Sequence, residues 1–263
     1  MTAHFAANAP TATSVNPIKV LSLNIHKGFS QFNRRMAIHD LRERLRTIDA
    51  DIVFLQEVQG LHLMHAERHA SWPDQPQHEF LAEGVWSASA YGLNARYDHG
   101  HHGNAILSRF DIAASHNQDV THLRFERRGV LHCVIRVPGM TQALHCVCVH
   151  LSLFARSRRR QIDALATRIE SLVPQDAPLI IAGDFNDWRN HADDLLAKRL
   201  ALHEIFGGSD GRPSRSFPAT LPLLRLDRIY VRGLHIEERT MHSGRPWSAI
   251  SDHAALSARL GVR

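Results

Sequence analysis

The chain has 263 residues, of which 44% are hydrophobic and 22% are charged, proportions typical of a globular protein with a sizeable core. It contains no apolar run close to the ~20 residues needed to span a bilayer, which argues against a helical integral membrane protein. Its formal charge of +5 favours a polyanionic partner but says nothing about chemistry.

Residues 1–17 lack a basic start followed by an apolar stretch, so we expect a mobile arm rather than a signal peptide. No long Pro/Gly-rich linker follows, and residues 18–263 are expected to form a single domain. Three cysteines, Cys133, Cys146 and Cys148, lie in apolar runs and are too few for a disulfide framework. Buried free thiols indicate a reducing compartment, and we expect the cytoplasm.

The first part of the chain predicts two buried strands that end on polar side chains. The apolar run 18–24 finishes on Asn24, and the run 51–57 finishes on Glu57. Between them, residues 34–48 carry apolar side chains at helical spacing, with Arg and Glu on the opposite face. Such alternation of strand and helix indicates a layered α/β architecture.

The middle of the chain predicts antiparallel strands followed by a second helix. From residue 103 to residue 151, short apolar runs alternate with turns, and His150 stands at the end of the last run. Residues 157–172 then repeat the helical spacing of apolar side chains. We therefore expect another strand, helix and strand to follow each other here.

A run of four apolar residues and a Gly leads into Asp184 and Asn186, two residues apart. Because side chains alternate along a strand, both are expected to point the same way at its tip. A carboxylate beside a carboxamide suits the positioning and deprotonation of a water molecule. A Gly-, Pro- and Ser-rich segment, 207–222, predicts a loop before Asp227, and His253 stands near the C-terminus.

Six polar segments follow one another along the chain: Asn24, Leu55-Gln56-Glu57, His150-Leu151, Gly183-Asp184-Phe185-Asn186, Leu226-Asp227-Arg228 and Ser251-Asp252-His253. Together they resemble the endonuclease/exonuclease/phosphatase superfamily, which includes pancreatic-type DNases, neutral sphingomyelinases and inositol polyphosphate phosphatases. The resemblance runs from about residue 18 to residue 260. It implies a four-layered α/β sandwich, with two mixed β-sheets face to face and helices outside, and a divalent-metal phosphoester hydrolase. It does not fix the substrate, because one scaffold serves many functions.

The resemblance also implies a metal site and a base. Glu57 is the expected ligand of Mg²⁺ or Mn²⁺, ions that take oxygen ligands, with Asn24 beside it as a ligand or an orienting group. Asp252 is expected to support the metal or its waters. Asp184 is expected to orient the attacking water and to accept its proton. The alternative is that Glu57 and Asp184 only cap a strand and a turn.

Four further roles complete the expected site. Asn186 would hold water or a phosphoryl oxygen, and His253 would donate to a phosphoryl oxygen while Asp227 fixes its tautomer. His150 would contact the scissile phosphate or protonate the leaving group. Two structural interpretations stay open, namely an ion pair of Asp227 with Arg228 and a core position for His150.

The histidine-rich loop before residue 105 is expected to border the substrate, as the corresponding segment does in related enzymes. On that basis His102 and Asn104 are candidate substrate contacts. A zinc site and a solvated loop are the alternatives, although the histidine spacing matches no zinc pattern.

The run from Arg156 to Arg160 stands at the start of the second predicted helix. Cations there oppose the helix dipole, so something should compensate for them. Substrate phosphate held by Arg158, Arg159 and Arg160 is one interpretation, and a solvated basic face is the other.

Two substrate classes, nucleic acids and phospholipids, are compatible with the sequence. Abasic-site endonucleases carry an acidic residue where this chain has His26 and a Tyr where it has His150, which brings the chain closer to the DNase and sphingomyelinase branches. We favour a phosphodiesterase or endonuclease that cleaves nucleic acid. The alternative is a phospholipid or lipid-headgroup hydrolase in peripheral contact with membranes. A non-catalytic binding module is disfavoured because the catalytic set is complete, and no obligate protein partner can be inferred.

Overall fold

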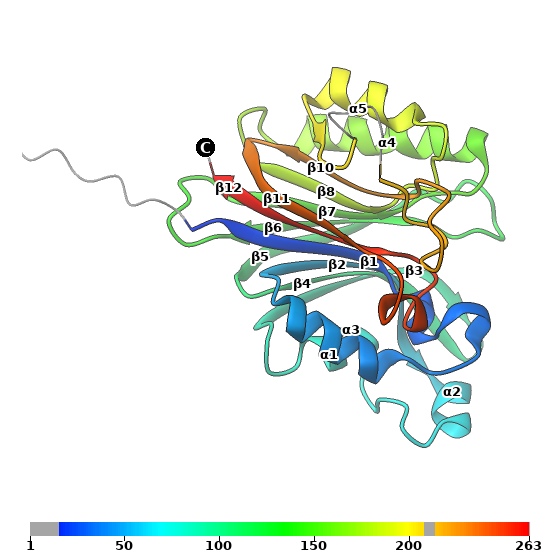
Figure 1. Cartoon of the computed structure of the whole chain (residues 1–263). Coiled ribbons are helices and arrows are strands. Elements are labelled where there is room, and N and C mark those ends of the chain that lie inside the picture. The colour runs from blue at the N-terminus through cyan, green and yellow to red at the C-terminus, as the bar shows by residue number, and fades with distance from the viewer. Residues whose placement is uncertain (1–15, 208–213, 263) are drawn as a thin grey trace, which may run out of the picture.

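The computed structural model describes residues 16–207 and 214–262. The arm expected for residues 1–17 therefore lies almost wholly outside the described residues. Two sheets of six strands each lie face to face, with helices against both outer surfaces (Figure 1). This arrangement confirms the four-layered sandwich that the sequence predicts.

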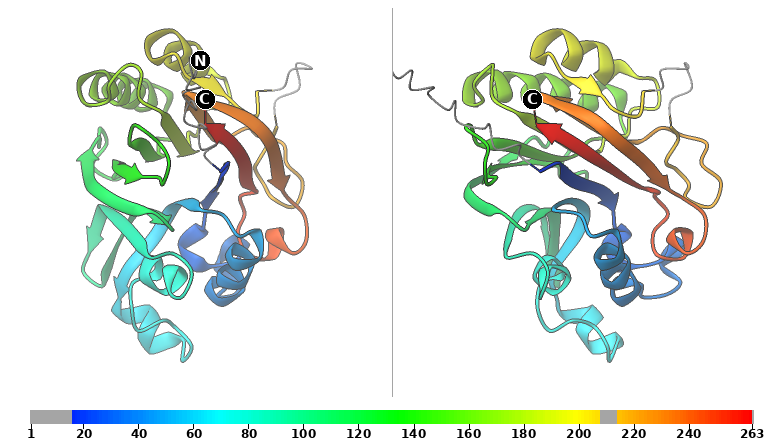
Figure 2. Two further views of the ribbon diagram at one scale, coloured as in Figure 1. Left: turned by 90° about the vertical axis from the view of Figure 1, so that its left-hand side faces the viewer. Right: turned by 60° about the vertical axis from the view of Figure 1, so that its left-hand side comes forward.

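The first sheet consists of β1 (Ile18–Asn24), β2 (Ile52–His62), β3 (Ala88–Tyr97), β4 (Gly100–Ser108), β11 (Leu234–His242) and β12 (Ala255–Val262). Its strands are ordered β11-β12-β1-β2-β4-β3, so the first and last strands of the chain are neighbours (Figure 2). The pair β1–β2 is parallel and the other neighbours are antiparallel.

The second sheet consists of β5 (Asp111–Asp119), β6 (Gly129–Arg136), β7 (Leu144–His150), β8 (Leu179–Asp184), β9 (His203–Glu204) and β10 (Asp227–Arg232). Their order is β5-β6-β7-β8-β10-β9, with β7 parallel to β8 and the other neighbours antiparallel. The antiparallel pairs β5–β6 and β6–β7 confirm the strands predicted for the middle of the chain.

Helices cover both outer surfaces (Figure 1). The first sheet is covered by α1 (Ile38–Ile48) and α3 (Gln77–Ala82), and the second by α4 (Ala155–Leu172) and α5 (His191–Leu200). The other helices of the described residues are α2 (Leu63–Arg68), η1 (His26–Gly28), η2 (Gln31–Asn33) and η3 (Trp247–Ala249). Within the described ranges, no helix is long and apolar enough to cross a bilayer.

The first predicted helix is shorter than expected. It begins at Ile38 rather than at residue 34, because the backbone of residues 28–30 bonds to that of residues 35–37 and closes a small loop there. The second begins at Ala155, two residues before its predicted start.

The central strands are apolar on both faces because each lies between two layers. Ile52 of β2 belongs to the core between the sheets, whereas its neighbour Val53 packs in the layer under α1. Ile180 and Ile181 of β8 divide in the same way between the inter-sheet core and the layer under α4. On β8 the only ionisable side chain, Asp184, therefore stands at the strand end.

The carboxyl ends of β1, β7 and β8 lie on the same side of the molecule (Figure 1). His150 at the end of β7 is the register partner of Asp184 at the end of β8, and Asp227 at the start of β10 stands on the other side of Asp184. Asn24 at the end of β1 donates a hydrogen bond to Asp184 from the opposite sheet. Asn24, His150, Asp184 and Asp227 therefore meet at one edge of the sandwich.

Candidate active site

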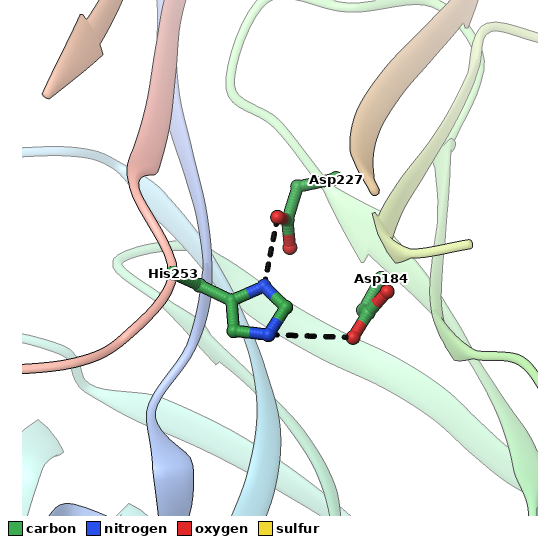
Figure 3. A group of neighbouring side chains, drawn as sticks. All are labelled: Asp184, Asp227 and His253. Carbon is green, nitrogen blue, oxygen red and sulfur yellow. Dashed lines mark hydrogen bonds and ion pairs between the residues drawn. The ribbon is translucent and has the colours of Figure 1, made fainter. Parts of the chain in front are cut away.

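Asp184 is the carboxylate at the centre of this edge, and its side chain is buried (Figure 3). Oδ1 accepts the backbone N–H of Asn186 at 2.9 Å, and Oδ2 accepts Nδ2 of Asn24 at 3.2 Å. One oxygen thus caps the turn while the other faces the polar cluster. Burial, opposed by the charge of His253, raises the pKa of Asp184 to about 6. A carboxylate with this pKa is well suited to accept a proton near neutral pH.

His253 and Asp227 form a hydrogen-bonded pair. Nδ1 of His253 lies 2.9 Å from Oδ2 of Asp227, and Nε2 lies 3.8 Å from Oδ2 of Asp184 (Figure 3). Burial alone would lower the pKa of His253, but the Asp227 and Asp184 carboxylates outweigh it and raise the pKa to about 10. The imidazole is therefore a cation at neutral pH, and its Nε2–H is available as a donor.

The alternative ion pair of Asp227 with Arg228 is not formed. The Arg228 guanidinium lies on the other face of β10 and donates to Oη of Tyr230 at 2.9 Å and to Oδ1 of Asp193 at 2.8 Å. Because side chains alternate along the strand, Asp227 and Arg228 point to opposite faces, and Asp227 is free to bond His253.

His150 is buried beside the same carboxylate, with Nε2 at 3.5 Å from Oδ2 of Asp184. Burial, together with the charge of Arg128, holds the pKa of His150 well below its usual value. A neutral imidazole donates a hydrogen bond more readily than it gives up a proton. Of the two expected roles, contact with the phosphate fits this ring better than protonation of the leaving group.

Glu57 lies in a bulge, not at the end of its strand as expected. β2 continues to His62, and its register with β4 shifts between Leu55 and Val58. Glu57 has a φ of 56°, a conformation that costs a non-glycine residue about 1–3 kcal/mol and tends to occur at functional sites. The bulge turns this partly exposed carboxylate toward a cavity while Gln56 stays buried.

A chain of contacts joins Glu57 to Asp252. Nδ2 of Asn24 lies 3.3 Å from Oε1 of Glu57, and Oδ1 of Asn24 accepts the His26 backbone N–H at 3.0 Å. Nδ1 of His26 lies 2.8 Å from Oδ1 of Asp252. Burial would raise the pKa of Asp252, but the bond from His26 and the charge of His253 lower it. With its amide in this orientation, Asn24 orients the carboxylates.

The oxygen donors at this edge fit a hard divalent cation. Glu57 presents a carboxylate to the cavity, Asp252 is held ionised, and Oδ1 of Asp227 is buried with no hydrogen-bond partner among the described residues. Oxygen ligands of this kind suit Mg²⁺ or Mn²⁺. A second possible group is Asp184, Asp227 and His253, whose ligand atoms lie within 4.8 Å of one another. In that group the imidazole is protonated on both nitrogens and offers no lone pair to a metal, so Glu57 is the better ligand.

The cavity beside Glu57 and His150 has a volume of about 670 Å³. Five cationic side chains that the sequence reasoning did not single out line it: Lys27, Arg96, Arg124, Arg127 and Arg128. They outnumber the two carboxylates of the lining, Glu57 and Glu126, so the cavity attracts anions. A basic run over residues 124–128 is visible in the sequence, but such runs are most often solvated faces, and only the fold brings this one to the site.

His102 lines this cavity, whereas Asn104 lies beneath it. Nδ2 of Asn104 donates to the carbonyls of Gly129 and Cys148 at 3.0 and 3.3 Å, so this fully buried amide ties the two sheets together. It is not placed to touch substrate, contrary to our expectation. The zinc alternative finds no support, because in the described part of the chain only Asp184, Asp227 and His253 group in metal-binding distance.

Arg158 is also not where the sequence interpretation put it. Its guanidinium is buried, donates to the carbonyls of Ser152 and Leu153 at 2.9 and 3.0 Å, and lies 3.5 Å from Asp187. This carboxylate supplies the compensation that a cation near the start of α4 requires. Arg159 and Arg160 are exposed, and Arg160 contacts His122.

Residues 21–253 match the family model of the endonuclease/exonuclease/phosphatase family. The chain belongs to this family. It is 48% identical over 251 residues to the uncharacterized protein YbhP of Escherichia coli K12, covering 95% of this chain and 99% of that protein.

Solved structures share the endonuclease/exonuclease/phosphatase fold at low sequence identity. The family protein from Beutenbergia cavernae has a TM-score of 0.73 at 17% identity, covering 94% of this chain and 72% of its own. D. rerio TDP2 in complex with a single-strand DNA product has a TM-score of 0.69 at 19% identity, covering 94% and 99%. A mannosyl-6-phosphatase from Bacteroides thetaiotaomicron has a TM-score of 0.69 at 16% identity, covering 92% and 99%. At these identities the likeness extends to the fold alone.

Proposed function

We propose that this protein is a Mg²⁺- or Mn²⁺-dependent phosphodiesterase that acts by in-line attack of a water molecule held by Asp184. The observation that carries the proposal is the convergence on one atom, Oδ2 of Asp184, of Asn24 at 3.2 Å, His150 at 3.5 Å and His253 at 3.8 Å. A buried carboxylate with a raised pKa and donors on three sides is arranged to hold and deprotonate water.

Each side chain then has a defined task. Asp184 accepts the proton of the attacking water, and the cationic His253 donates from Nε2 to a phosphoryl oxygen while Asp227 holds Nδ1. Neutral His150 donates to the same phosphate. Asn186 is fixed by its bond from Nδ2 to the Leu151 carbonyl at 2.9 Å, which leaves Oδ1 to orient water.

Glu57 and Asp252 would hold the divalent ion, and Asn24 would keep the carboxylates in place. When bound, the ion neutralises negative charge on the phosphoryl group. The complete set of polar side chains disfavours a non-catalytic binding module, and the buried free thiols of Cys133, Cys146 and Cys148 support a cytoplasmic location.

Two substrate classes fit the cation-lined cavity. Nucleic acid is favoured by the motif pattern, and the fold shared with a TDP2–DNA complex is compatible with it. A phospholipid is favoured by exposed apolar side chains that line the same cavity, Phe125, Leu153 and Phe154. No feature of the described residues requires a protein partner.

A metal-supplemented screen tests the proposal. Purified protein would be assayed with Mg²⁺ or Mn²⁺ on DNA, RNA, phospholipids, phosphoinositides and a simple chromogenic phosphodiester. We expect hydrolysis of at least one substrate, and a loss of roughly 10²–10⁴ in kcat in Asp184→Asn, which keeps the shape of the side chain but removes the base. Full activity of Asp184→Asn, or no hydrolysis of any phosphoester, would reject the proposal.

A further inference from the structure

Three large apolar side chains stand in solvent at the rim of the cavity. Phe125 is 77% exposed, Leu153 is 54% exposed and Phe154 is 50% exposed. The rings of Phe125 and Phe154 pack edge to face with their centroids 5.8 Å apart, although the residues belong to different loops. Contiguous exposed apolar side chains of this kind mark interaction surfaces in soluble proteins.

The two loops are held together from inside by Glu126. This buried carboxylate accepts the backbone N–H of Leu153 at 2.9 Å and the hydroxyl of Ser152. The backbone N–H of Glu126 donates to the Leu123 carbonyl at 2.9 Å and closes the tight turn that carries Phe125. The apolar rim is thus a built feature of the fold, fixed by buried polar bonds rather than left on loose segments.

Cations flank the same rim. Arg124 and Arg127 are exposed on either side of Phe125 and Glu126, line the cavity and have no carboxylate partner among residues 16–207 and 214–262. Arg128 and Lys27 lie deeper in the lining. Aromatic and aliphatic side chains beside unpaired arginines form the pattern of segments that lie in an anionic membrane interface.

A second apolar turn borders the catalytic pair. Backbone pairing of Phe217 with Leu224 closes it, and it exposes Leu221 by 67% and Leu223 by 54%. The Phe217 ring lies 5.0 Å from the His253 ring, so this turn is in direct contact with the site. Apolar tips therefore occur next to the cavity and next to the catalytic pair.

We propose that this rim docks the protein on an anionic phospholipid bilayer, with Phe125, Leu153 and Phe154 inserted at the level of the headgroups and Arg124 and Arg127 against lipid phosphates. Docking would deliver a phospholipid headgroup to the adjoining cavity. The hydrolytic consequence rests on the proposed function, whereas the docking itself does not.

Single-stranded nucleic acid fits the rim less well. Stacking requires open aromatic faces, but the edge-to-face contact of the two phenylalanines covers a face of one ring and Leu153 has no ring. The described residues that line the cavity include no Asn, Gln, Ser or Thr, so the edge of a base would have to be read by charged side chains, Tyr97 or the histidines. The cations could bind the phosphates of nucleic acid or of lipids equally well. The exposed apolar side chains favour the lipid bilayer.

The test is vesicle co-sedimentation in excess chelator, so that binding is measured without hydrolysis. Wild-type protein should bind phosphatidylglycerol-containing vesicles and bind phosphatidylcholine vesicles more weakly. The triple variant Phe125→Ser, Leu153→Ser, Phe154→Ser should bind roughly tenfold or more weakly, because apolar insertion scales with buried area. Arg124→Gln with Arg127→Gln should lose about fivefold per arginine on anionic vesicles alone.

Matched controls lie at the far ends of β6 and α4, the two elements that follow the rim loops. Leu172→Ser changes an apolar residue, 48% exposed, at the other end of α4, and Arg136→Gln changes an exposed cation at the other end of β6. Both should bind as the wild type does. Circular dichroism melting identifies any variant that is not folded, and the single variants Phe125→Ser and Phe154→Ser would then replace the triple variant.

Wild-type protein that does not bind anionic vesicles would overturn the docking proposal, as would folded rim variants that bind like the controls. A rim variant that loses single-stranded DNA binding by fluorescence anisotropy, but not vesicle binding, would overturn it in favour of nucleic acid. Vesicle binding by a protein that hydrolyses no phosphoester would reject the proposed function alone. Hydrolysis of a soluble phosphodiester without vesicle binding would reject only the docking.

Discussion

The Nδ1 atom of His253 lies 2.9 Å from Oδ2 of Asp227, and this bond turns Nε2 of the imidazole toward Asp184, 3.8 Å away. The two carboxylates raise the pKa of the imidazole and make it a cation. The cation in turn offsets part of the rise that burial causes in the pKa of Asp184. The three groups therefore form one electrostatic unit, with a base and a positively charged donor side by side.

Because His253 and Asp227 act as one unit, the losses in kcat caused by changing each of them should not multiply. His253→Ala should lower kcat by roughly 10²–10⁴, and Asp227→Asn should lower it by disturbing the orientation and charge of the ring. The double variant should lose much less than the product of the two single effects. Steady-state kinetics of the wild type, the two single variants and the double variant on a soluble phosphodiester measure these losses. Strictly multiplicative losses would show that the two residues act independently.

The bulged position of Glu57 leads to a prediction about metal binding itself. Glu57→Gln should weaken Mn²⁺ binding in calorimetric titration by roughly tenfold or more, because it removes a charged ligand, with the fold unchanged. Glu43→Gln on the solvent side of α1 is the matched control and should bind Mn²⁺ as the wild type does. Unaltered Mn²⁺ affinity of Glu57→Gln would move the metal to the Asp184 group.

The buried position of Arg158 predicts a role in stability. Arg158→Ala should lower the free energy of unfolding by roughly 2–4 kcal/mol, because it leaves two carbonyls without their donor and removes one of the two cations beside the buried Asp187. Arg159→Ala, on the exposed side of the same helix, should change it by less than about 0.5 kcal/mol. Urea denaturation measures both, and equal small effects would contradict the assigned contacts.

The pKa shifts at the site predict a bell-shaped dependence of kcat/KM on pH. Asp184 must be ionised, so hydrolysis should fall as pH drops through its raised pKa of about 6, or lower when a divalent ion is bound. His253 must be protonated, so hydrolysis should fall as pH rises through about 10.

Asp227→Asn removes the largest cause that raises the pKa of His253, and should therefore move the alkaline limb of this profile to lower pH. The same limb in wild type and variant would show that His253 is not the group that titrates.

The layered fold could be predicted from the sequence, in part from its strand and helix patterns and in part from the family resemblance of its polar segments. Fully apolar strands must lie between two layers, and the carboxyl ends of parallel strands fall on the same edge. Asn24, His150 and Asp184 stand at such strand ends, whereas Glu57 does not.

The misplaced residues depend on information that strand patterns do not contain. Helical spacing places Arg158 four residues before Ile162, on the buried face of α4, so its burial was open to prediction from periodicity. The bulge at Glu57, the burial of Asn104 and the cations of the 124–128 run depend instead on packing between distant segments, on which the local sequence is silent.

Dependence on a divalent ion tests the central claim most directly. Hydrolysis of a soluble chromogenic phosphodiester would be followed in excess chelator and again after Mg²⁺ or Mn²⁺ is added back, with the free-ion concentration known. The site as assigned predicts that hydrolysis disappears with the chelator and returns with either ion, and that Glu57→Gln needs more of the ion to recover. Undiminished hydrolysis in excess chelator would contradict it.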